Sequence, residues 1–122
     1  MKIKKLIATT VAAVMMTSSA ALAEFPDRTI ENIFPWSAGK ALSVSQIIAK
    51  AMGEELGVSL PVVSTPGAAG TKAFKTAMAR PADGYTIFDG YVAPLVLQPV
   101  LGKADWSYSD FKPLHAAVSN AF

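Results

Sequence analysis

The chain has no cysteine and one histidine among its 122 residues. Without cysteine it can form no disulfide bond, no thiolate metal site and no lipoprotein anchor. One histidine is too few for a histidine-based metal site or a Ser-His-Asp triad, so His115 is interpreted as an ordinary side chain. We therefore expect neither a metal nor a cofactor.

Long hydrophobic runs are also missing. The longest apolar run, residues 6–16, is about half of the roughly 20 residues that a membrane-spanning helix needs. It follows a basic stretch, Met1–Lys5, and precedes the small-residue triplet Ala21–Ala23. This order predicts a secretory signal peptide over residues 1–23, cleaved after Ala23, rather than an uncleaved anchor.

Net charge of either sign is low once that segment is removed. The signal peptide contains three of the eleven Lys and Arg residues and no acidic residue, so the mature chain has a formal charge of −1. The basic pI is therefore largely a property of the leader. No basic patch remains to indicate binding to nucleic acid or to an anionic membrane.

The mature part, residues 24–122, alternates between short apolar runs and amphipathic segments. In the first expected helix the apolar residues recur at helical spacing and predict one apolar face, formed by Val44, Ile47, Ile48, Ala51, Met52 and Leu56. Ser43 with Gln46 predicts a capping box at the start of the first helix, Gly57 a left-handed residue at its end, and Thr71 a cap for the second helix. The expected strands are 30–34, 60–63, 85–88 and 114–118, and the expected helices are 43–56, 71–80 and 93–101. This alternation predicts an α/β fold with a mainly parallel sheet and flanking helices.

Three loops follow the expected strands, over residues 35–41, 64–70 and 89–92. The carboxyl ends of parallel strands meet at one edge of the sheet, where ligands of such folds bind. Two of the loops are rich in Gly and Ala and lead into helices. Small residues let a ligand approach the backbone, and the free N–H groups of a helix start favour an anion.

Five motifs in order resemble one known family, the substrate-binding proteins of tripartite tricarboxylate transporters, also called Bug-type receptors. They lie at Phe25–Arg28, Pro35–Gly39, Pro66–Gly70, Ala82–Thr86 and Asp110–Pro113. Each motif alone is weak, and five in the family's order over nearly the whole mature chain are fairly specific. The resemblance implies a periplasmic-binding-protein-like (type II) fold, of which residues 24–122 form the partial, truncated first lobe.

The resemblance also implies a function. It predicts a periplasmic receptor, not an enzyme, that binds a small organic carboxylate and delivers it to a membrane permease. The residues that it assigns to the ligand are Trp36, Ser37, Ala38, Gly39, Gly67, Ala68, Ala69, Gly70, Thr71, Gly90 and Tyr91. Lys40–Ser43 depart from the family pattern, which has further glycine and an aspartate there.

Two other interpretations remain open. Ser37 and Lys40 match the Ser-x-x-Lys pattern of penicillin-binding hydrolases, but the partner motifs Ser-Asp-Asn and Lys-Thr-Gly are absent. The chain is also short for this family, whose members have about two to three times its mature length, enough for two domains. A nonfunctional remnant is therefore the other alternative.

The leader gives the first testable prediction. Mass spectrometry of the periplasmic fraction of an expressing cell should find Glu24 as the N-terminus, because the small-residue triplet ends at Ala23. Recovery of the intact Met1 form in the inner membrane would contradict it.

Overall fold

A computed structural model describes residues 24–117, so the predicted signal peptide lies outside the described residues. The strands are β1 (Glu31–Phe34), β2 (Val62–Ser64) and β3 (Thr86–Phe88). The helical elements are α2 (Lys40–Leu56), α3 (Thr71–Met78) and α4 (Gln98–Val100), with the short helices η1 (Ala68–Gly70), η2 (Ala93–Leu97) and η3 (Tyr108–Asp110). Within residues 24–117, no helix is long and apolar enough to cross a membrane.

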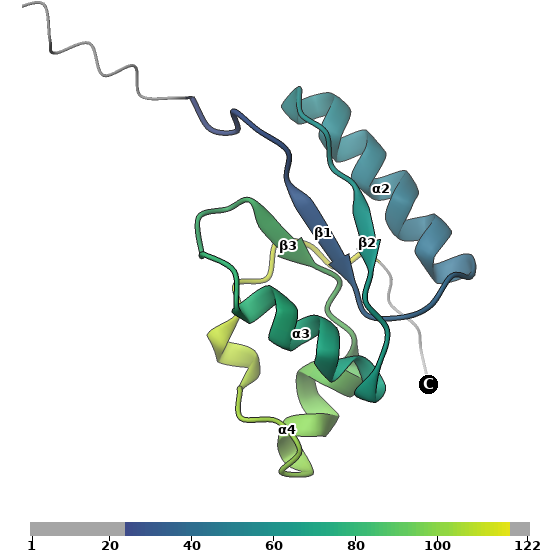
Figure 1. The fold of residues 1–122 in the computed structure, drawn as a ribbon, viewed down its shortest axis with the longest axis vertical. Helices are drawn as coiled ribbons and strands as arrows, with labels where there is room; N and C mark the ends of the chain where they lie inside the picture. Colours follow the sequence, from purple (N-terminus) through teal and green to yellow (C-terminus); the bar gives the residue numbers. More distant parts are fainter. Residues whose placement is uncertain (1–23, 118–122) are drawn as a thin grey trace, which may run out of the picture.

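The three strands form one parallel sheet in the order β2-β1-β3. Asn32 of the central strand lies opposite Val62 on one side and Ile87 on the other. In Figure 1, α2 lies on one side of the sheet and α3 on the other, with η2 and α4 beyond α3. The predicted α/β class with a parallel sheet and flanking helices is thus confirmed.

One face of the sheet packs against α2. The buried cluster there contains Ile30 before β1, Ala49 of α2 and Leu60 before β2. The helix approaches through its small residues Ser45, Ala49 and Gly53, which are its buried positions. This narrow contact lets the backbone of α2 lie close to the segment that leads into β2.

Aromatic side chains fill the other face. Phe74 of α3 is fully buried, and its ring lies 4.6 Å from that of Phe88, 5.7 Å from that of Trp106 and 5.5 Å from that of Phe111. Trp106 also donates its indole N–H to the carbonyl of Pro94 at 3.0 Å. Aromatic pairs of this kind contribute about 0.5–1.5 kcal/mol each beyond burial. The cluster fixes the segment after α4 onto the sheet.

Two predicted helix caps are wrong. The first helix begins at Lys40, not after Ser43, and its N-cap is Gly39, with no side-chain capping bond. The Ser43 hydroxyl instead lies 3.5 Å from the Gly39 carbonyl. The second helix is capped by the backbone at Gly70, not by the Thr71 side chain, which is buried. The predicted C-terminal residue of the first helix, Gly57, is confirmed as left-handed at φ 68°.

The predicted apolar face of the first helix is mostly not the face that packs. Val44, Ile47 and Ile48 are 44%, 70% and 37% exposed, whereas Met52 of the same face packs against the buried cluster. The face that packs is the small-residue face described above. Packing distance decided the orientation here, because only small side chains fit between α2 and the chain entering β2.

The end of the described chain differs from expectation. A fourth strand was expected over 114–118, but the described part, 114–117, has no strand. The helix expected over 93–101 is present as η2 and α4 together. Pro94 lies in the first turn, where a missing N–H is tolerated, whereas Pro99 lies inside this continuous helical stretch.

Gly53 gives the second prediction. A Cβ at this position would lie 2.7 Å from the carbonyl oxygen of Val58, a backbone atom that cannot move alone. Glycine to alanine inside a helix normally stabilises by about 1 kcal/mol, whereas forced overpacking costs about 1–3 kcal/mol. Gly53→Ala should therefore lower the free energy of unfolding, measured by urea denaturation. Lys50→Ala on the exposed side of α2 is the control and should change it by less than about 0.5 kcal/mol. A stabilised Gly53→Ala would contradict this packing.

Candidate functional site

The loops after the three strands meet at the carboxyl edge of the sheet, as the sequence predicts. Ser64, at the end of β2, donates its hydroxyl to the carbonyl of Trp36 at 2.6 Å. The Thr65 N–H donates to the Phe34 carbonyl at 2.8 Å, and the Asp89 N–H to that of Ile33 at 3.1 Å. Hydrogen bonds therefore join the loop after β1 to the end of β2, and the end of β1 to the first residues of the second and third loops.

Aromatic contacts strengthen the link between the first and third loops. The Tyr91 ring stands edge-on to Trp36 at 5.6 Å and to Phe34 at 6.1 Å. Trp36 is half-buried, so its ring packs against Tyr91 and still has part of its surface exposed at this edge. Burial, and then the Asp89 charge, raise the pKa of the Tyr91 phenol, which favours its neutral form.

The second loop has an unusual backbone. Four consecutive residues, Gly67 to Gly70, have positive φ, and two of them are alanines, Ala68 at 48° and Ala69 at 52°. Left-handed conformation costs a residue with a Cβ about 1–2 kcal/mol. Such strain is typical of ligand-binding loops. The turn closes with the Gly70 N–H donating to the Gly67 carbonyl at 3.0 Å.

The exposure of the predicted site residues differs from loop to loop. Ser37, Ala38, Gly39, Gly67, Ala68, Ala69 and Gly90 are exposed, Trp36 and Tyr91 are half-buried, and Gly70 and Thr71 are buried. Gly70 has no room for a side chain, because a Cβ there would lie 2.8 Å from Pro94 of η2. The two buried residues therefore shape the edge, whereas the exposed ones are open to a ligand.

Sequence reasoning missed a polar network beneath this edge. The Asn32 amide donates to the Ser45 hydroxyl at 3.1 Å and to an Asp89 carboxylate oxygen at 3.4 Å. Ser45 donates to the other Asp89 oxygen at 2.5 Å. Asn32 is 5% exposed, and its Oδ1 accepts no hydrogen bond from the described residues. A polar residue in the centre of a buried strand is the signal that could have revealed this network.

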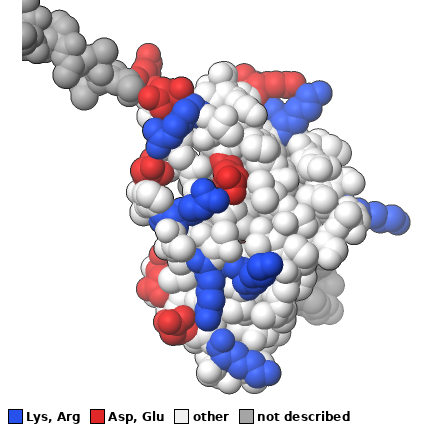
Figure 2. All heavy atoms as spheres, viewed as in Figure 1, with Lys and Arg blue, Asp and Glu red and all other residues white. Residues whose placement is uncertain are grey.

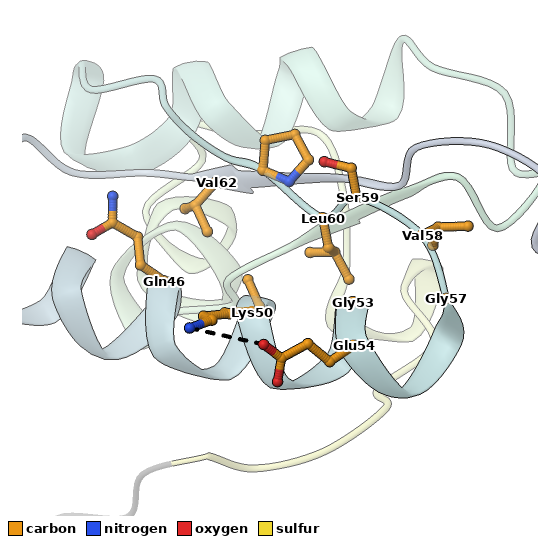
Figure 3. Close-up of a pocket in the computed structure, with 11 residues that line it drawn as sticks. Gln46, Lys50, Gly53, Glu54, Gly57, Val58, Ser59, Leu60 and Val62 are labelled. Atoms are coloured by element: carbon orange, nitrogen blue, oxygen red, sulfur yellow. Dashed lines mark ion pairs between the residues drawn. The ribbon is translucent and has the colours of Figure 1, made fainter.

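The structure also has two surface hollows. One lies between α2 and the chain that enters β2, with the Lys50–Glu54 ion pair at its rim (Figure 3). The other runs along α3 from Gly67 and Ala68 past Lys72, Lys75 and Arg80. Figure 2 shows several cationic side chains near one another on the face that α3 presents. The cations of this second hollow border the second loop. The sequence analysis did not assign them to the site.

The hydrolase pattern gains no support from the geometry. Ser37 and Lys40 are both exposed, and no hydrogen bond joins them in the described structure. Residues 24–117 contain no group of three or more His, Cys, Asp or Glu side chains that could hold a metal ion.

The fold and the position of the loops define the class of protein to which this structure is similar, the periplasmic solute-binding proteins. The chain is similar to a TctC solute-binding protein from Polaromonas, solved without ligand, with a TM-score of 0.62 and 28% identity over 71% of this chain. It is also similar to R. palustris Rpa4515 with adipate, with a TM-score of 0.53 and 28% identity over 55% of this chain. A structure described as a periplasmic transporter matches 52% of it with a TM-score of 0.50. These structures confirm the predicted resemblance to tripartite tricarboxylate transporter receptors.

The match is partial on both sides. The chain spans 30%, 23% and 22% of the length of these three solved chains, respectively. No family profile matches the sequence, and no curated protein does.

The strained second loop gives the third prediction. Ala69→Gly removes a left-handed alanine, whose strain costs the folded state about 1–2 kcal/mol. The substitution also increases the conformational entropy of the unfolded chain, which lowers stability by about 0.4–1 kcal/mol. The net result should be a stabilisation of about 0.5–1 kcal/mol in chemical denaturation. Ala79→Gly, at the right-handed C-cap of α3, is the matched control and should destabilise instead. Loss of stability in both variants would show that Ala69 is not strained.

Proposed function

We propose that this chain supplies one wall of a receptor site for a small organic carboxylate, in a periplasmic solute-binding protein that serves a membrane permease. The meeting of the three loops at the carboxyl edge is the observation that carries the proposal. The resemblance assigned its ligand residues to these loops, and one of the similar structures was solved with adipate.

The chemistry of the edge fits a carboxylate. Ala68 and Ala69 are exposed and lie directly before the N-terminus of α3, where the helix dipole favours a negative charge. The cations along α3 add positive potential beside the same loop. Trp36 and Tyr91 offer an aromatic wall for an apolar carbon chain between or beyond the carboxylate groups.

The Asp89 carboxylate opposes an anion at this edge unless its charge is neutralised locally. Two hydrogen bonds, from Ser45 and Asn32, hold it away from the loop tips. We propose that this network positions the third loop and leaves the exposed backbone of the second loop as the place for the carboxylate.

The wall alone should bind weakly. The N-termini of α2 and α3 together contribute about 1–2 kcal/mol of binding free energy toward an exposed anion, whereas micromolar affinity needs about 8 kcal/mol. The family site closes two domains around its ligand, so the remaining free energy has to come from an opposite wall. This part of the proposal agrees with the small share of the similar solved chains that the sequence spans.

The fourth prediction tests this site by backbone amide NMR of the mature chain during a titration with adipate. Shifts should be confined to the amides of the loops, above all Ala68, Ala69, Gly90 and Tyr91, and they should not saturate at micromolar ligand. The uncharged diamide of adipic acid is the matched control. It has the same carbon chain and should cause much smaller shifts, because the proposed attraction acts on charge.

Three outcomes separate the proposal from its alternatives. Shifts elsewhere, or equal shifts with the diamide, would contradict the site. Saturation at micromolar adipate would show that one wall is sufficient. Absence of any shift favours a nonfunctional remnant. For the hydrolase, acylation by a labelled β-lactam that is lost in Ser37→Ala would be decisive.

A further inference from the structure

Helix α2 carries a second apolar face, on the side away from the sheet. Four residues at helical spacing form this outer face: Val44, Ile47, Ile48 and Ala51. Ile47 is 70% exposed and Val44 is 44% exposed, although both lie within a well-formed helix. Its buried face is made of small residues instead, so the larger apolar side chains of the helix contact water. A continuous apolar patch on a helix is typical of an interaction surface.

The charges at the two ends of α2 oppose its dipole. Lys40 is the first residue of the helix, and Glu54 and Glu55 lie in its last turn, with no acid in the first turn and no base in the last. Cations at a helix N-terminus and anions at its C-terminus are unfavourable. Glu54 pairs with Lys50 at 3.8 Å. Lys40 and Glu55 form no ion pair among the described residues.

The outer face matches itself when two copies of α2 run antiparallel. If the two-fold axis passes midway between Ile47 and Ile48, Ile47 of one copy lies opposite Ile48 of the other. The same register places Val44 opposite Ala51, so that a larger side chain meets a smaller one. It also places Lys40 opposite Glu55. One register thus pairs both the apolar and the charged residues, and an isologous interface requires this self-complementarity.

We propose that α2 is a homodimerisation helix that pairs antiparallel with the α2 of a second copy of this chain through the outer face. The partner then supplies the charges that each helix lacks, because the Glu55 carboxylate of one copy lies beside the N-terminus of the other. A second exposed apolar surface, on η2 and α4, includes Val100, which is 78% exposed, but nothing on it shows comparable self-complementarity. That surface supplies the control position.

Disulfide trapping of the mature chain is the fifth prediction and tests the register. The chain contains no cysteine, so every crosslink reports the introduced residues alone. An equal mixture of Val44→Cys and Ala51→Cys chains should form a crosslinked heterodimer under mild oxidation. Each variant alone should crosslink far less, since two copies of the same position are separated by about 10 Å along the helix axis. Equal crosslinking in the single-variant samples would overturn the register.

Sedimentation analysis tests the same interface without a crosslink. Ile47→Lys should weaken self-association by about a hundredfold or more, because it places two cations close to the two-fold axis. Val100→Lys should leave self-association unchanged. Lys40→Glu and Glu55→Lys should each weaken it by about threefold to tenfold, and the double variant should restore it.

The outcomes decide the proposal whatever becomes of the ligand site. A strictly monomeric parent chain would overturn it, and so would loss of the dimer in Val100→Lys but not in Ile47→Lys. If the charge-swapped double variant does not recover, the antiparallel pairing is wrong. Circular dichroism of each variant checks that α2 remains folded, and recovery in the double variant excludes simple unfolding as the cause.

Discussion

Every other element of the structure depends on the parallel pairing of β1 with both of its neighbours. Asn32 and Ile33 each have a partner residue in β2 and in β3. Because the three strands point the same way, each carboxyl end delivers its loop to the same edge. The first loop is then tied to β2 through Ser64 and to the third loop through Tyr91. A shift in strand register would break these contacts and move the three loops apart.

The buried network of Asn32, Ser45 and Asp89 shows how this pairing reaches α2. Asn32 is on the central strand, Ser45 is on the small-residue face of the helix, and Asp89 follows β3. A buried polar group without partners costs about 1–3 kcal/mol. The hydrogen bonds across these three elements give partners to the Asn32 amide nitrogen, the Ser45 hydroxyl and the Asp89 carboxylate, while the Asn32 Oδ1 accepts none from the described residues. The same contacts hold α2 close to the sheet. A larger residue at position 45 would push the helix away from the sheet and break the hydrogen bonds that Ser45 makes.

The sequence predicted β1, β2 and β3, the parallel topology and the three loops, because these depend on local pattern and on chain order, whereas the strand expected over 114–118 is absent from the described part, 114–117. It did not predict which face of α2 is buried. Helical spacing favoured Ile47 and Ile48, but the close approach at Gly53, where even a Cβ lies 2.7 Å from Val58, admits only small side chains. The Asn32 network and the left-handed alanines were missed for a related reason. Both result from packing between elements that no local window contains.

Two features of this structure are unfavourable in the isolated chain: the strained second loop and the exposed apolar face of α2. Ala68 and Ala69 have positive φ, where glycine would have a lower conformational free energy. Alanine at these positions is explained if its methyl group or its restricted backbone contributes to ligand binding. Val44, Ile47 and Ile48 occupy positions where polar residues would cost less, which is reasonable if another surface covers them. The loop lies at the carboxyl edge of the sheet, whereas the face extends along the outside of α2. A partner on the helix would therefore leave the second loop open, and ligand binding and pairing could be compatible in one assembly.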